Sequence, residues 1–212
     1  MIVSLLYLNR DDINALRIQD AYSLHRIVYS LFDDIRSDQQ KLESISSGFL
    51  YVDKGGDWDH RQILILSNRP LNEPKCGKIK STVLSESFLQ HEHYGFEITL
   101  NPTKRDTASG KIVPIRGSEA VKEWFISKAP TSWGFEVLSE KLQIQSIGVK
   151  SFEKKGHHVT HGSATLIGEL IVTDRNKFIQ NFQHGIGRGK SFGFGLLQIV
   201  PLINHNNREI NI

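Results

Sequence analysis

Cysteine is nearly absent from this chain of 212 residues, which excludes several classes of protein. Cys76 is the only cysteine, so one chain can form neither an internal disulfide nor a zinc site built from several thiolates. This usage is typical of a reducing compartment, and we expect a cytoplasmic protein. Long apolar runs are lacking too. No stretch approaches the ~18 residues of a membrane helix, and neither end shows the apolar core of a signal peptide.

The chain also lacks a large excess of charge of one sign. It has 26 Lys and Arg residues against 23 Asp and Glu residues, and a net charge of +3 does not by itself indicate a nucleic-acid partner. The distribution is more informative, because residues 104–116 contain only one acid, Asp106. The basic residues of this segment are Lys104, Arg105, Lys111 and Arg116. We therefore expect a basic face on the C-terminal half that binds a phosphate backbone.

The first half of the sequence alternates apolar strands with an amphipathic helix. Residues 1–8 predict a buried strand. A helix is predicted over residues 20–36, with Asp20 as its N-cap and an apolar stripe of Leu24, Val28, Leu31 and Ile35. Residues 48–52 and 62–66 predict a hairpin, residues 85–90 a short helix and residues 94–100 an alternating strand. This order is the ferredoxin-like pattern.

The second half repeats this order loosely. Pro102 and the polar residues after it interrupt the chain, so we expect two domains, residues 1–101 and 102–212. Helices are predicted over residues 118–128 and 174–183, the second capped by Asp174, and strands over residues 164–173 and 194–200. Residues 135–149 predict one strand or two. The expected fold class is α+β, with two tandem ferredoxin-like (RRM-like) domains and a glycine-rich loop near the C-terminus.

The glycine-rich segment contains five glycines within residues 185–195, which is costly unless the backbone must approach another group closely. Its Gly-Lys-Ser ending is typical of a phosphate-binding P-loop, but that motif needs a glycine where His184 stands. A P-loop also leads from a strand into a helix, whereas this loop follows a predicted helix. Two alternatives remain: a structural turn, or a backbone cradle for RNA phosphates. The cradle would use Gly187, Arg188, Gly189, Lys190 and Ser191.

The predicted helix over residues 20–36 presents a candidate catalytic group. RNA can be cleaved without a metal when its own 2′-OH attacks the adjacent phosphorus, and a histidine can move the protons because its pKa lies near neutrality. Tyr22, His25 and Tyr29 share a flank of the helix at i+3 and i+4 spacing. A lone histidine at such a position is more often a packing residue.

Three separate segments together carry a resemblance to a known family. Residues 185–197 read Gly-Ile-Gly-x-Gly-Lys-Ser-x-Gly-x-Gly-Leu-Leu, residues 22–25 read Tyr-x-x-His, and residues 101–104 read Asn-Pro-Thr-Lys, followed by Gly110-Lys111 and Val113-Pro114. This ordered set resembles the repeat-associated RNA-binding (RAMP) superfamily, and within it the CasE branch of type I-E CRISPR repeat endoribonucleases. The similarity spans nearly the whole chain.

The resemblance implies a metal-independent endoribonuclease that binds the hairpin of CRISPR repeat RNA, with no cofactor and no metal. It would cleave precursor transcripts, retain the guide RNA product and serve as a subunit of a CRISPR surveillance complex, with no membrane partner. His25 would be general base or general acid, and Tyr22 would position the phosphate or the 2′-OH. Arg26 would join the residues that bind RNA.

A lysine from the second domain would stabilise the phosphorane, and the candidates are Lys150, Lys154 and Lys155. Residues 156–162 depart from the family pattern and contain His157, His158 and His161. One of these histidines could perform the second proton transfer, or all three could lie on an exposed hairpin. Two other functions stay open: a RAMP-type subunit that binds RNA without cutting it, and a nucleotide-binding protein built on the glycine-rich loop.

Overall fold

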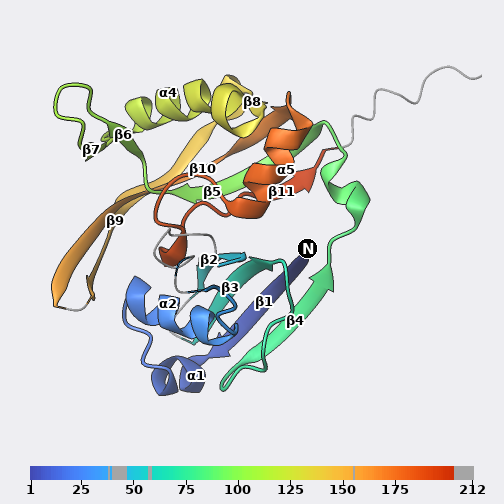
Figure 1. Ribbon diagram of the computed structural model, residues 1–212, viewed down its shortest axis with the longest axis vertical. Coiled ribbons are helices and arrows are strands. Elements are labelled where there is room, and N and C mark those ends of the chain that lie inside the picture. The colour runs from blue at the N-terminus through green and yellow to red at the C-terminus, as the bar shows by residue number, and fades with distance from the viewer. Residues whose placement is uncertain (38, 40–46, 57–58, 155, 203–212) are drawn as a thin grey trace, which may run out of the picture.

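The computed structural model describes residues 1–37, 39, 47–56, 59–154 and 156–202. It is a mixed α and β structure with two main antiparallel sheets, as the fold class predicted at this coarse level (Figure 1). The first sheet has the strand order β2-β3-β1-β4. Its strands are β1 (Ile2–Asn9), β2 (Phe49–Gly56), β3 (His60–Ser67) and β4 (Lys78–Val83), and two helices follow β1, namely α1 (Arg10–Ala15) and α2 (Ala21–Ser30).

The second sheet has the strand order β11-β5-β10-β8, with β9 also paired to β10. Helices α4 and α5 lie on one side of this sheet (Figure 1). Its strands are β5 (His93–Leu100), β8 (Phe135–Val137), β9 (Gln143–Lys154), β10 (His157–Val172) and β11 (Gln198–Pro201). The helices are α4 (Ser118–Lys128) and α5 (Arg175–His184), and the short turns are η1 (Glu86–Leu89), η2 (Ala129–Trp133), η3 (Ser139–Lys141) and η4 (Lys190–Phe192).

Two antiparallel hairpins project from the body of the second sheet. Strands β9 and β10 pair far beyond the rest of the sheet, so they form a long two-stranded ribbon that reaches toward α2 (Figure 1). The other hairpin joins β6 (Thr103–Arg105) to β7 (Ile112–Pro114).

The central strands of the first sheet are covered on both faces. On one face Ile63 and Ile65, both fully buried, pack with Leu24 and Val28 of α2. On the other face Leu50, Val52 and Leu66 join the core of the second sheet. This two-sided burial explains the unbroken apolar run in β3, because each fully buried aliphatic side chain contributes roughly 1.5–3 kcal/mol.

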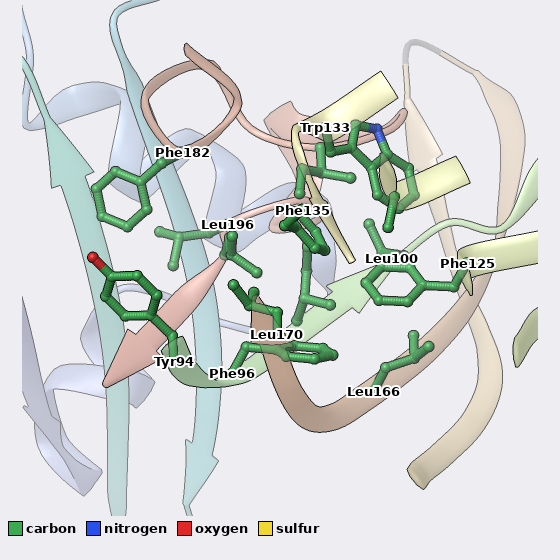
Figure 2. Close-up of a cluster of buried hydrophobic side chains, with 14 of the residues drawn as sticks. Tyr94, Phe96, Leu100, Phe125, Trp133, Phe135, Leu166, Leu170, Phe182 and Leu196 are labelled. Atoms are coloured by element: carbon green, nitrogen blue, oxygen red, sulfur yellow. The ribbon is translucent and has the colours of Figure 1, made fainter. Parts of the chain in front are cut away.

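The core of the second sheet is rich in aromatic side chains. Figure 2 shows the rings of Phe96, Phe125 and Phe135 gathered with Trp133. Phe125 lies 5.7 Å from Phe96 and 5.1 Å from Trp133 between ring centroids, within the range of favourable aromatic contacts. One apolar core therefore holds α4, α5 and both sheets together. Among the described residues, no helix is long and apolar enough to cross a membrane.

The helix that carries His25 is shorter than predicted. Asp20 does cap it, since its carboxylate accepts from the Ser23 amide at 2.7 Å, but the helix ends at Ser30 rather than near residue 36. Ile35 was therefore wrongly assigned to the apolar stripe and is 70 % exposed. The periodicity continued by chance beyond the last helical turn.

The strand over residues 94–100 was assigned to the wrong sheet. It is β5, which pairs with β10 and β11, whereas the fourth strand of the first sheet is β4. The sequence did not reveal β4 because it is polar and mostly exposed, with no alternation of buried side chains. A boundary at residue 101 therefore cuts the second sheet after its first strand. The closing strand also starts later than expected, at Gln198 instead of residue 194.

Candidate active site

Helix α2 presents Tyr22, His25 and Tyr29 on one flank, as the spacing predicted. Leu24 and Val28 anchor the opposite flank in the first core, so the orientation of the helix follows from its apolar stripe. The rings of Tyr22 and His25 stack with centroids 5.8 Å apart, and Tyr29 lies 4.1 Å from His25. Arg26 is exposed and places its guanidinium 5.6 Å from the Tyr22 ring.

The imidazole of His25 is oriented by the glycine-rich segment. Its Nδ1 lies 2.7 Å from the carbonyl oxygen of Ser191, which can only accept, so Nδ1 carries the proton. The hydroxyl of Tyr51 donates to the same carbonyl at 2.9 Å and fixes its direction. In the neutral ring Nε2 then has the free lone pair, which is the form that a general base requires.

The surroundings of His25 favour this neutral form. Burial lowers the pKa of His25 below its usual value. The hydrogen bond to Ser191 opposes that shift, and the positive charge of Lys154 adds to it. Near pH 7 the ring is therefore predominantly neutral and able to accept a proton at Nε2.

A buried aromatic cluster of Phe152, Phe192 and Phe194 lies behind His25. Phe192 approaches the His25 ring to 5.3 Å, and Phe152 stacks on Tyr22 at 6.3 Å with nearly parallel planes. Both phenylalanines of the glycine-rich segment are buried in this core, although they lie in the 3₁₀ turn and the loop before β11 and not in a strand. The cluster joins β9, η4 and α2, so it fixes the flank of the helix that carries His25 against the second sheet.

The candidate lysines occupy different positions around this cluster. Lys154 places its ammonium 5.4 Å from the Phe192 ring centroid, and its positive charge lowers the pKa of His25. Lys150 places its ammonium 4.6 Å from Phe194, and burial lowers its pKa, against the opposing charge of Asp53. The third candidate, Lys155, lies outside the described residues. Lys154 is thus the described lysine of this set that the structure brings to His25.

The glycine-rich segment is shaped by its packing. Each of its five glycines has a positive φ between 78° and 81°. A Cβ on Gly195 would lie 2.2 Å from the Ile186 carbonyl oxygen, and a Cβ on Gly189 would meet the Phe194 ring at 2.9 Å. Lys190 closes the loop by donating to the His184 carbonyl at 2.8 Å, at the C-terminal end of α5. Arg188 and Gly187, by contrast, are exposed.

The remaining basic residues predicted to bind RNA lie on or near the β6–β7 hairpin. All four are exposed, and the Arg105 guanidinium donates to the Gly110 carbonyl at 2.6 Å, which holds the hairpin turn. They are Lys104 and Arg105 on β6, Lys111 just before β7, and Arg116 just before α4.

A family model described as "CRISPR associated protein" matches residues 1–201 of this chain. The chain belongs to the CRISPR-associated protein family. The resemblance carried by the three motifs is thereby confirmed at the level of the family. A relative from Thermus thermophilus, the CRISPR-associated endoribonuclease Cse3, is 28 % identical over 116 residues, which cover 50 % of this chain and 54 % of the relative. The match thus spans about half the length of that relative.

Solved structures of other CRISPR-associated proteins share the fold. Cse3 bound to a 19-nucleotide RNA superposes with a TM-score of 0.78 at 20 % identity, covering 95 % of this chain and all of the other. Cas6e from Escherichia coli K-12 gives a TM-score of 0.70 at 21 % identity with the same coverage. A chain of a CRISPR RNA-guided surveillance complex gives 0.72 at 22 % identity over 95 % of this chain and all of that one.

Three contributors to this CRISPR-associated site were missed by sequence reasoning: Tyr51, the Ser191 carbonyl as a partner of His25, and the environment of His161. Ser191 was predicted to bind RNA, but the structure shows its carbonyl engaged by Tyr51 and His25. His161 is half-buried against Phe152, Phe192 and Phe194, whereas His157 and His158 are exposed. No local signal marks these contacts, because they join segments more than 100 residues apart or depend on strand register.

Proposed function

We propose that this protein is a metal-independent endoribonuclease that binds the hairpin of CRISPR repeat RNA and cuts precursor transcripts into guide RNAs. One observation carries the proposal: the Ser191 carbonyl holds Nδ1 of His25 and leaves Nε2 as a base, beside Tyr22 and Lys154. The endoribonuclease name of the Thermus relative and the RNA-bound structures of similar fold support it. The surveillance complex among the similar structures supports a role as a subunit of such an assembly.

The proposed reaction uses the RNA's own 2′-OH as the nucleophile. Nε2 of His25 takes the 2′-OH proton, and the 2′-oxygen forms a bond to the adjacent phosphorus. The bond from phosphorus to the 5′-oxygen breaks as that oxygen takes a proton from water. The products are a 2′,3′-cyclic phosphate and a 5′-OH. Lys154 supplies positive charge to the phosphorane, and the Tyr22 hydroxyl positions the phosphate or the 2′-OH. We assign Lys154 this role because its positive charge lowers the pKa of His25, whereas the ammonium of Lys150 lies over the Phe194 ring.

The strand orders support two tandem ferredoxin-like units. In the first sheet β1 is central and pairs with β3 and β4, and in the second sheet β5 is central and pairs with β10 and β11. This is the arrangement that a β-α-β-β-α-β unit produces if β8 and β9 together take the place of the second strand. We place the division between β4 and β5 instead of at residue 101. The second unit has both helices, α4 and α5, while no helix lies between β3 and β4 in the first, where every residue is described.

RNA binding is assigned to exposed basic side chains on and near the β6–β7 hairpin and in the glycine-rich loop. Lys104, Arg105, Lys111, Arg116 and Arg188 are exposed, and Arg26 extends this set at the active site. Lys190 and Ser191 contribute by holding the loop and His25 in place, since their groups are engaged within the protein. Cleavage of one bond beside the stem leaves the contacts to the stem phosphates in place, so the protein retains the hairpin product.

The decisive experiment incubates the protein with repeat RNA from its own genome in the presence of EDTA. Cleavage should persist, because the 2′-OH serves as nucleophile, and the products should carry the cyclic phosphate. A matched RNA with a single 2′-deoxy substitution at the cut site should bind nearly as well and stay intact. Normal cleavage of that deoxy RNA would disprove the mechanism.

The two alternative functions are less well supported. A binding subunit without activity needs no base, yet the Ser191 carbonyl, which also accepts from Tyr51, holds the His25 ring in the tautomer that a base requires. A nucleotide-binding protein needs a phosphate loop that opens into a helix. Here the loop leads only into a three-residue 3₁₀ turn, and Lys190 is bonded to His184.

A further inference from the structure

A cavity of about 690 Å³ lies between the β6–β7 region, the start of α4 and the β9–β10 ribbon. Its volume falls in the range of about 300–1,000 Å³ that is typical of ligand sites. Part of its lining is apolar and open to solvent: Ile112, Ile147 and Val149 are 38, 50 and 70 % exposed. Large β-branched side chains gathered at one exposed hollow indicate an occupant that covers them.

The charged residues that line this cavity are all basic. Arg116 and Arg188 line it, and neither Asp nor Glu is among the described residues that do so. Arg188 is attached to the cavity wall through a backbone bridge to Asn101. This charge is complementary to an anionic occupant, which favours RNA over an apolar segment of a protein partner.

A hydrogen bond between Asn101 and His161 adds a donor of fixed direction to the lining of the cavity. The side-chain amide of Asn101, which is 7 % exposed, donates to Nδ1 of His161 at 3.1 Å. The neutral His161 ring therefore carries its proton on Nε2, as a donor suited to a base edge or a ribose oxygen. Both residues line the cavity.

We propose that this cavity binds one unpaired nucleotide next to the hairpin of the RNA. The apolar wall takes the base, Arg116 and Arg188 take the phosphates, and His161 supplies a hydrogen bond. A base inside a duplex stem faces its partner strand, so only an unpaired nucleotide can insert a base here. The inference rests on the proposed function and adds to it a determinant of substrate choice outside the stem.

Gly162 offers a way to fill the cavity without straining the backbone. It lines the cavity and lies directly opposite Val149 in the ribbon, so a side chain there shares the face of the apolar wall. Its Cβ would lie 3.7 Å from Asn101 Oδ1 and 3.9 Å from Pro102 Cδ, which are ordinary contacts, and its φ is not in the left-handed region. Gly162→Leu should therefore occupy the space of the base. Ser146→Leu is the matched control, because it places the same side chain at an exposed position of the ribbon outside the cavity.

The assay measures dissociation constants in a His25→Ala background, so that the RNA stays intact. Two RNAs are compared: the repeat hairpin with its unpaired flanks, and the same hairpin trimmed to the paired stem. The background protein and Ser146→Leu should prefer the flanked RNA by about tenfold, the order expected for one well-packed base. Gly162→Leu should bind both RNAs with the affinity that the background protein has for the trimmed one.

Retention of the preference by Gly162→Leu would overturn the proposal, as would a background protein that binds both RNAs equally. A background protein that binds neither RNA would instead refute the proposed function. If Gly162→Leu has lost its native circular dichroism, Val149→Glu decides, because Val149 is 70 % exposed and the new carboxylate repels a phosphate. Loss of the preference in Val149→Glu supports the nucleotide site, and its retention excludes it.

Discussion

His25 and His161 contact the same phenylalanine ring but are held in opposite protonation patterns. Their ring centroids lie 5.3 and 5.6 Å from that of Phe192. At His25 a carbonyl faces Nδ1 and leaves the lone pair on Nε2, whereas at His161 an amide donor faces Nδ1 and leaves the proton on Nε2. One ring is therefore prepared to accept a proton and the other to donate a hydrogen bond. The partner of one nitrogen, more than the residue type, decides what a histidine can do.

The comparison is tested most severely by removing each imidazole in turn. His25→Ala should lower the single-turnover cleavage rate by about 10² to 10⁴, the contribution typical of a general base, with little change in RNA affinity. His161→Ala should weaken binding of flanked RNA and leave the cleavage rate of saturated enzyme within a few fold. Equal losses of rate in both variants would contradict the division of roles.

The next largest effect concerns the lysine beside His25. Lys154→Met should slow cleavage by about 10², since a charge that stabilises the phosphorane is lost. The same change removes a positive charge that lowers the pKa of His25, so that pKa should rise. A base works when unprotonated, so the rate increases with pH through its pKa. The acidic limb of the pH–rate profile should therefore move to higher pH in Lys154→Met.

Lys150→Met is the matched control for this shift. Its ammonium lies over Phe194, and its charge does not contribute to the pKa shift of His25. The acidic limb should stay where it is in the parent enzyme. A shift in Lys150→Met with none in Lys154→Met would reverse the assignment of the two lysines.

The smallest effect should separate the two basic residues of the glycine-rich loop. Arg188→Gln should weaken RNA binding and reduce the slope of log K against log salt by about 0.7–0.9, as expected when one phosphate contact is lost. Lys190→Gln should leave the slope nearly unchanged and lower the thermal midpoint, because Lys190 is bonded to the His184 carbonyl. If the slope of log K against log salt changes only in Lys190→Gln, then Lys190 and not Arg188 contacts the phosphate.

Three elements lie where the sequence predicted them: the helices over residues 118–128 and 174–183 and the hairpin of β2 and β3. Asp174 caps the second helix, and the hairpin strands are rich in buried apolar side chains. Strand β4 was not predictable, because an edge strand with polar side chains carries no burial signal. Missing that strand moved β5 into the wrong sheet.

The candidate site was predictable only in part. Tyr22 and His25 follow from helical spacing, together with the family motif. The choice among the lysines depends on the register of β9 against β10, which places Lys150 opposite His161 and Lys154 opposite His157. The partner of His25 is the backbone carbonyl of Ser191, and every residue type has such a carbonyl, so the sequence cannot indicate this contact.

The bond between His25 and Ser191 joins positions 166 residues apart. During synthesis on a ribosome, the helix that carries His25 is therefore made well before the carbonyl that orients it. Until Ser191 has left the ribosome, the imidazole rotates as in a peptide, without its fixed tautomer. The orientation of the proposed base is thus a property of the folded chain and cannot belong to the N-terminal segment alone.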